Sequence, residues 1–144
     1  SLRTVFRHFD EMENLFLEIA GTIIRRAEEY IGKPFANEQW PGLLPELVDR
    51  RAEFYEEVGA FKLALDYHRR RSPALAAAHA QVAELSRNVL LSRIPEADMP
   101  DRTVVEALVL LVSIETWQRL RLTQRLGVEE AKAVVLTAMQ ALAR

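Results

Sequence analysis

The side chains that could take part in chemistry are few, because the sequence contains no cysteine. A di-iron centre in a helical bundle needs Glu-x-x-His pairs on facing helices. None of the three histidines has a glutamate three positions before it. The HExxH motif, glycine-rich phosphate loops and the nucleophile elbow are also absent. We therefore expect no metal, no cofactor and no enzymatic activity, although a Ser-His-acid set brought together by the fold stays open.

Polar residues inside apolar helical stripes are the candidates for a small-molecule pocket. Arg51 is the clearest case, because it lies between Leu47 and Val48 on one side and Phe54 and Tyr55 on the other. Its guanidinium would provide the counter-charge for an acidic ligand. In the alternative, its aliphatic part lies on the core while the charged end reaches solvent, which is the commoner arrangement for arginine.

Two further polar residues, His79 and Ser86, share a stripe with Val82, Val89 and Leu90. Each could hydrogen-bond a ligand or be a satisfied core residue. Aromatic residues could form the pocket walls, although aromatics at helical spacing are usually core. The predicted ligand-binding residues are Arg51, Phe54, Tyr55, Phe61, His79, Ser86 and Trp117.

Helices must position these residues, because the hydrophobic spacing is helical throughout and no stretch resembles a strand. Asp10 followed by Glu13 is typical of a capping box and predicts a helix over 10–31. Ser72 and Asp101 are good N-caps for two later helices. The expected helices after the first cover about 42–58, 73–93, 101–126 and 129–143, with Gly59 and Gly127 as breaks. A short helix after Gly59 is expected to carry Phe61, Leu65 and His68. The predicted fold class is all-α.

Composition limits the class of protein. With 144 residues the chain is long enough for one compact domain. A formal charge of -2 excludes a basic nucleic-acid-binding surface over the whole chain and leaves room for a small basic patch. The lack of cysteine fits a reducing cytoplasm, and no signal peptide or membrane-spanning stretch is evident. We expect a soluble, cytoplasmic protein.

Two segments near the C-terminus, 104–114 and 131–142, are apolar around almost their whole circumference. A helix of this kind must be covered on all sides. We expect the pair to pack against a second copy in a four-helix bundle, giving a two-fold homodimer. In the alternative, one helix is the central helix of a monomer and the other is amphipathic. The predicted interface residues are Val104, Leu108, Leu111, Val135, Ala138 and Leu142.

The N-terminal run SLRTVFRHFDEMENL, residues 1–15, resembles the end of the DNA-binding domain of a TetR-family transcriptional regulator. In that family a Ser caps the recognition helix, a Thr-aliphatic-aromatic-x-His/Tyr-Phe run follows, and an acidic turn begins the next helix. The segments WQRL, residues 117–120, and LGVEEA, residues 126–131, are similar to the C-terminal pattern of many members. The resemblance spans the whole chain, but only its first fifteen residues form a specific motif.

The resemblance implies an all-helical homodimer, usually a repressor, whose DNA binding weakens when a small-molecule effector occupies a regulatory pocket. Residues 1–9 would be the remnant of the recognition helix of a helix-turn-helix, and 10–144 the ligand-binding and dimerisation domain. The residues that would contact operator DNA are Arg3, Thr4, Arg7 and His8. The two preceding helices are not in this sequence, so tight operator binding is not expected of it. Phe6 and Met12 depart from the family, which usually has Tyr and Lys there.

The resemblance implies a small-molecule ligand, which we expect to be largely apolar. A second hypothesis is a helical homo- or heterodimerisation module with no small-molecule ligand. A well-formed apolar cavity would favour the sensor, and a fully packed core would favour the interaction module.

Overall fold

The computed structural model describes all 144 residues and confirms the all-α fold class. The six α-helices are α1 (Leu2–Ile31), α2 (Leu44–Arg69), α3 (Pro73–Leu91), α4 (Arg102–Leu111), α5 (Ile114–Gln118) and α6 (Val128–Leu142). A 3-10 turn at Glu96–Asp98 precedes α4, and a π-helical turn at Arg119–Thr123 follows α5. None of the helices is long and apolar enough to cross a membrane.

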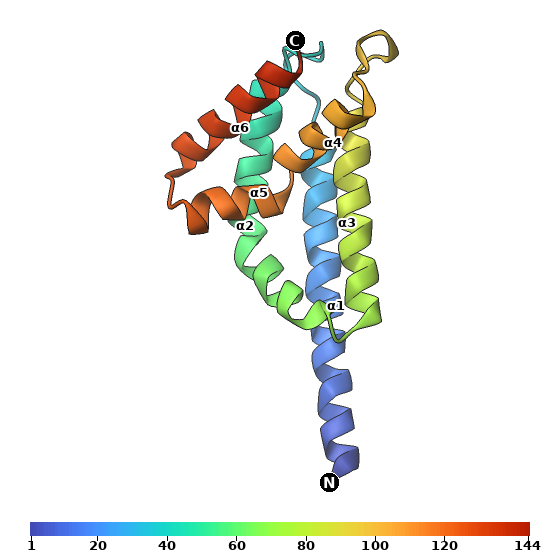
Figure 1. Ribbon diagram of the computed structural model, residues 1–144. Coiled ribbons are helices and arrows are strands. Elements are labelled where there is room, and N and C mark those ends of the chain that lie inside the picture. Colours follow the sequence, from blue (N-terminus) through green and yellow to red (C-terminus); the bar gives the residue numbers. More distant parts are fainter.

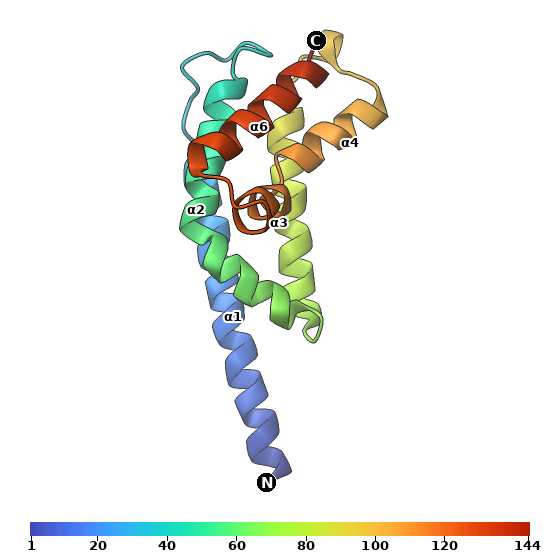
Figure 2. The ribbon, with the colours of Figure 1, turned by 60° about the vertical axis from the view of Figure 1, so that its left-hand side comes forward.

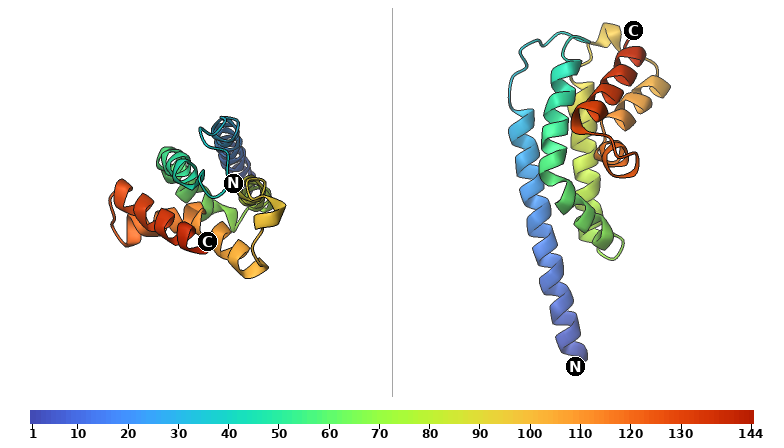
Figure 3. Two further views of the ribbon diagram at one scale, coloured as in Figure 1. Left: turned by 90° about the horizontal axis from the view of Figure 1, so that it is seen from above. Right: turned by 90° about the vertical axis from the view of Figure 1, so that its left-hand side faces the viewer.

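The helices form two layers. The three long helices α1, α2 and α3 run up, down and up beside one another, and each contacts the other two (Figure 1). The shorter helices α4, α5 and α6 cover the side of α2 and α3 that faces away from α1 (Figure 3). Figure 2 shows α4 and α6 side by side in this second layer, where they contact each other.

The first helix is longer than the sequence predicts, because α1 begins at Leu2 and passes through Asp10 without a break. Its N-cap is Ser1, whose Oγ accepts a hydrogen bond from the Thr4 N–H at 3.2 Å. The predicted capping box at Asp10 is therefore wrong. Its second member, Glu13, instead accepts a hydrogen bond from Ser72 Oγ and so ties α1 to the turn between α2 and α3. The N-terminal part of α1 projects from the body of the molecule (Figure 1).

The predicted break at Gly59 is also wrong, because α2 continues through it to Arg69. Glycine inside a helix costs about 1 kcal/mol relative to alanine. Buried Val58 and Leu65 on either side supply packing that offsets this cost. The Gly59 carbonyl also accepts a hydrogen bond from Gln118 Nε2 at 3.2 Å, which connects α2 to α5.

The single helix expected over 101–126 is divided, since α4 ends at Leu111 and α5 begins at Ile114. Ser113 causes the restart, because its Oγ accepts a hydrogen bond from the Thr116 N–H at 3.2 Å. Two predicted caps are confirmed: Ser72 accepts from the Leu75 N–H, and Asp101 accepts from the Val104 N–H.

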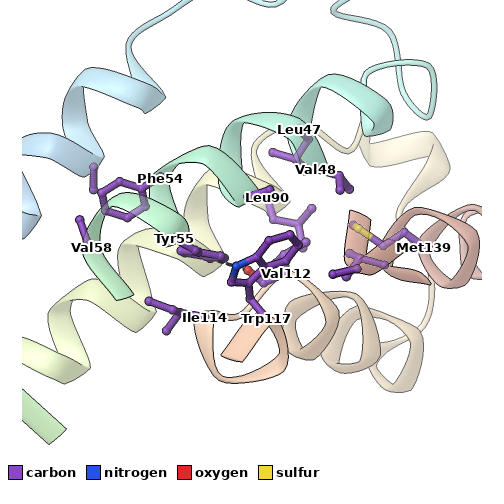
Figure 4. Close-up of a cluster of buried hydrophobic side chains, with 14 of the residues drawn as sticks. Leu47, Val48, Phe54, Tyr55, Val58, Leu90, Val112, Ile114, Trp117 and Met139 are labelled. Atoms are coloured by element: carbon purple, nitrogen blue, oxygen red, sulfur yellow. Dashed lines mark hydrogen bonds between the residues drawn. The ribbon is translucent and has the colours of Figure 1, made fainter. Parts of the chain in front are cut away.

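The hydrophobic core is centred on α2, which packs against α1, α3, α5 and α6. Figure 4 shows Tyr55 and Val112 in the middle of this core, with Phe54 and Val58 towards α1 and Met139 on α6 at the other side. Tyr55 Oη donates a hydrogen bond to the Val112 carbonyl at 2.5 Å. This bond fixes the end of α4 against the middle of α2.

The core also corrects the predicted dimer interface. Leu108 and Val135 are buried within the chain itself, at 0% and 5% exposure, and are not free to contact a second copy. Val104, Leu111, Ala138 and Leu142 are half-buried. The large apolar side chains that α4 and α6 leave exposed are Leu110, at 64% exposure, and Val134, at 46%. Each helix therefore buries one apolar side in the chain's own core, and only its exposed side is available to a partner.

Candidate ligand cavity

A cavity of about 170 Å³ lies between α1, α2, α3 and the junction of α4 with α5. Most of its wall is apolar, with Ile23 and Ala27 from α1, Phe54 and Val58 from α2, and Val82 from α3 among the lining residues. The lining residues extend over several turns of α1, α2 and α3, on the sides of these helices that face one another. The cavity therefore runs along the three long helices. Its lining helices include the packed half of α1, which connects it to the projecting N-terminal segment.

Five of the predicted ligand-binding residues lie together in this wall: Arg51, Phe54, Tyr55, His79 and Ser86. The other two do not. Phe61 lies on the outer side of α2 and is 54% exposed. Trp117 is buried away from the cavity, where its Nε1 donates a hydrogen bond to Glu56 Oε1 at 2.9 Å. Both predictions rested on helical spacing, and spacing alone does not show whether an aromatic side chain lines a cavity, packs in the core or lies on the surface.

Arg51 is half-buried and directs its charged end towards acceptors of the protein. Its Nη1 donates to Ser86 Oγ and, at 3.2 Å, to the Val112 carbonyl. Its Nη2 donates to the Ser86 carbonyl at 2.9 Å, and Nη1 lies 3.3 Å from Tyr55 Oη. The guanidinium is thus held by four protein contacts and does not extend freely into solvent, which was the alternative considered for this residue. No carboxylate lies within ion-pairing distance of Arg51.

A second polar group closes the cavity further along α2. The Lys62 side chain is buried, with 7% of its surface exposed. Its Nζ lies 2.7 Å from both carboxylate oxygens of Asp66 and 3.4 Å from Glu115 Oε1. His79 lies beside this group, with Nδ1 3.8 Å from Asp66 Oδ1 and Nε2 3.9 Å from Glu115 Oε1. Burial lowers the pKa of His79, and the positive charges of Lys62 and Arg69 lower that pKa further.

At the opposite end, Arg50 holds the loop that follows α1. Its Nη1 donates to the Lys33 carbonyl at 2.5 Å, and its Nη2 pairs with Glu46 Oε1 at 2.5 Å. The guanidinium also lies over the Phe35 ring, 4.1 Å from the centroid. The backbone N–H of Ala36 is the main cause of the lowered pKa of Glu46, with the Arg50 hydrogen bond adding to it.

Sequence reasoning missed several lining residues, notably Tyr30, Phe35, Arg50 and Lys62. The spacing contained a signal for Lys62, because it lies four residues after Val58 on the same buried stripe. Phe35 had no such signal, since it belongs to a loop. No group of three His, Asp or Glu side chains is arranged to hold a metal ion. The cavity thus offers apolar walls, hydroxyl groups and one guanidinium without a carboxylate partner.

The four predicted DNA-contacting residues are all exposed on the projecting part of α1. Residues three and four apart share a face of a helix. Arg3, Thr4, Arg7 and His8 therefore form a polar face, and Leu2, Val5, Phe6 and Phe9 form the opposite, apolar face. These four apolar side chains are 53 to 76% exposed. The segment is thus amphipathic, with neither face covered.

Comparison of the chain with known protein families, with curated proteins and with solved structures finds no match.

Proposed function

We propose that this chain is the regulatory and dimerisation part of a TetR-like transcriptional repressor, in which a small, largely apolar effector modulates DNA binding by an N-terminal helix-turn-helix. The observation that carries the proposal is the continuity of α1. One uninterrupted helix lines the cavity with Ile23, Ala27 and Tyr30 and bears Arg3 and Arg7 on its projecting end. A change at the cavity can therefore move the N-terminal segment as a rigid extension.

The amphipathic N-terminal segment supports the same proposal. Its polar face carries two arginines, a threonine and a histidine, which are donors suited to phosphates and base edges. Its opposite face exposes Val5, Phe6 and Phe9, which need a hydrophobic partner such as the other helices of a helix-turn-helix. The chain as a whole carries a formal charge of only -2 and no excess of positive charge, so DNA binding would depend on this local segment.

The cavity favours the sensor over a dimerisation module that has no ligand. A core built only for packing fills its interior closely, with few voids larger than a water molecule. This chain instead keeps an apolar cavity of about 170 Å³ that is partly open to solvent, large enough for a ligand the size of benzene, which an engineered cavity of about 150 Å³ binds. Effector binding would favour one of two arrangements of the domains and so change the spacing of the DNA-reading segments.

The exposed side of α4 and α6 supports dimerisation. Leu110 and Val134 would contact their symmetry mates in a two-fold bundle of four helices. We expect sedimentation velocity to give a dimer at micromolar concentration and a monomer for the L110E/V134E double variant. The matched control is L63E, which places a charge at an exposed apolar position of α2 and should leave the dimer intact. A wild-type monomer would contradict this part of the proposal.

DNA recognition needs its own test, made with protein that carries a complete helix-turn-helix. Selection from a random duplex library should enrich a palindromic site, because a two-fold dimer places its two reading helices on two half-sites. Substitution of Arg7 by Gln should weaken binding to the selected site, whereas R25Q, on the same helix within the body, should not. Failure to enrich any duplex would contradict the regulator and leave the dimerisation module.

A further inference from the structure

We propose that the effector is a small organic carboxylate, whose charged group binds Arg51 and whose apolar part fills the cavity. This inference rests on one part of the proposed function, namely that the cavity binds a small-molecule ligand. It narrows the ligand from any small apolar molecule to one chemical class, and it starts from the charges in the cavity wall.

Three cationic side chains line the cavity, and only one of them lacks a carboxylate partner. Arg50 pairs with Glu46, and Lys62 pairs with Asp66 and Glu115. Arg51 is held only by neutral acceptors: a hydroxyl and carbonyl of Ser86, the Val112 carbonyl and the Tyr55 hydroxyl. A half-buried charge without an opposite charge is costly, and an anion bound beside it would offset that cost.

The N–H groups of Arg51 that have no protein acceptor are suitably placed to bind a carboxylate. Guanidinium has five N–H groups, and the protein uses those of Nη1 and one of Nη2. The Nε–H and the second Nη2–H make no hydrogen bond, and Nε is not enclosed by protein atoms. Two N–H groups of a planar guanidinium match the two oxygens of a carboxylate in a bidentate pair. The side chain is already fixed by Ser86 and Val112, so little order would be lost on binding.

The rest of the wall sets the size and orientation of the ligand. The apolar side chains around Arg51, including Phe54, Val58 and Val89, suit a hydrocarbon body. A volume of about 170 Å³ fits one aromatic ring or a short chain with its carboxylate. Glu115 lies at the Lys62 end, where its charge would repel the ligand's carboxylate. The carboxylate is therefore directed to the Arg51 end.

Paired probes test the proposal. We would measure binding of benzoate and hexanoate at pH 7 by calorimetry, together with benzamide and hexanamide as neutral analogues of the same shape. Because hydrogen bonds to charged groups are the stronger ones, we expect at least one carboxylate to bind about tenfold or more tightly than its amide. This comparison uses the unchanged protein and does not depend on any variant folding correctly.

Variants then locate the charge. R51Q should remove the preference for the carboxylate, R51K should keep part of it, and R87Q, which lies outside the cavity lining, should keep it fully. If amides bind as tightly as carboxylates, or if folded R51Q keeps the preference, the carboxylate inference is wrong and the apolar sensor survives. If none of the four probes binds, both the carboxylate inference and the small-molecule sensor are contradicted.

Discussion

The two halves of α1 differ sharply, although one uninterrupted helix contains both. Its C-terminal half buries Phe16, Ala20 and Ile23 against α2 and α3 and lines the cavity. Its N-terminal half leaves Phe6 and Phe9 about 60% exposed. Isolated helices of fewer than about 12 to 15 residues are marginal in water. The projecting half therefore owes its helical form to propagation from the packed half, which couples the two mechanically.

The largest expected effect on stability comes from replacing one phenylalanine by alanine in each half of α1 and comparing the two losses. Phe16 is 9% exposed and stacks on His68, with ring centroids 4.0 Å apart. We expect F16A to lower the free energy of unfolding by about 3 to 5 kcal/mol, because it creates a cavity in the core. F9A, at an exposed position, should change it by less than about 0.5 kcal/mol. Urea unfolding followed by circular dichroism checks both, and equal losses would contradict the difference between the halves.

A smaller loss of stability is expected at Ser72, which contacts α1 where its packed half begins. Ser72 caps α3 and also donates a hydrogen bond to Glu13 on α1. S72A should therefore lower the free energy of unfolding by about 1 to 2 kcal/mol, at the upper end for loss of an N-cap. The control is S92A, because Ser92 is exposed at the other end of α3 and bonds only to its own helix turn. An S72A variant as stable as S92A would show that this connection contributes nothing.

Hydrogen exchange sharpens the comparison without substitutions. Backbone amides of residues 2–11 should exchange much faster than those of residues 16–31, since local opening follows the density of buried contacts. Mass spectrometry of peptides from each half measures the two rates. Similar protection along the whole of α1 would mean that the projecting half is covered in solution, and that would argue for a partner there.

The smallest expected effect is a pH dependence from His79. Burial lowers the pKa of this residue below 6.5, so the unfolded chain binds a proton more readily than the folded protein. The free energy of unfolding should therefore fall as the pH drops below about 6.5. The facing groups are Lys62, Arg69, Asp66 and Glu115, and H79Q should remove this part of the slope. H8Q, on the exposed half of α1, is the matched control and should keep it.

Local signals predicted much of the fold, and they failed where packing or propagation of a neighbouring helix opposed them. Ser72 and Asp101 are N-caps as expected, because a cap depends on three or four neighbouring residues. Asp10 and Gly59 have the residue types of a start and a break, yet the helix continues through both. At Gly59 the buried Val58 and Leu65 hold it, and at Asp10 it is propagated from the packed part of α1. The divided helix after Leu111 had only Ser113 as a signal, inside an apolar run that favoured continuation.

For the cavity, the sequence could predict which residues face inward on a helix, but not what they contact. Periodicity placed Arg51, Tyr55 and Ser86 on inward-facing stripes, and all three line the cavity. It gave no information on what Arg51 bonds to, because Ser86 and Val112 are 35 and 61 residues away in the chain. For the same reason it assigned Leu108 and Val135 to a partner, although the chain itself covers them.

A native mass spectrum of the protein purified without added ligand tests the central proposal most directly, because it reports the number of subunits and any bound small molecule together. We expect a dimer that carries an extra mass, with that mass absent from the spectrum of R51Q. A monomer with no added mass across micromolar concentrations would contradict both the four-helix interface and the effector site.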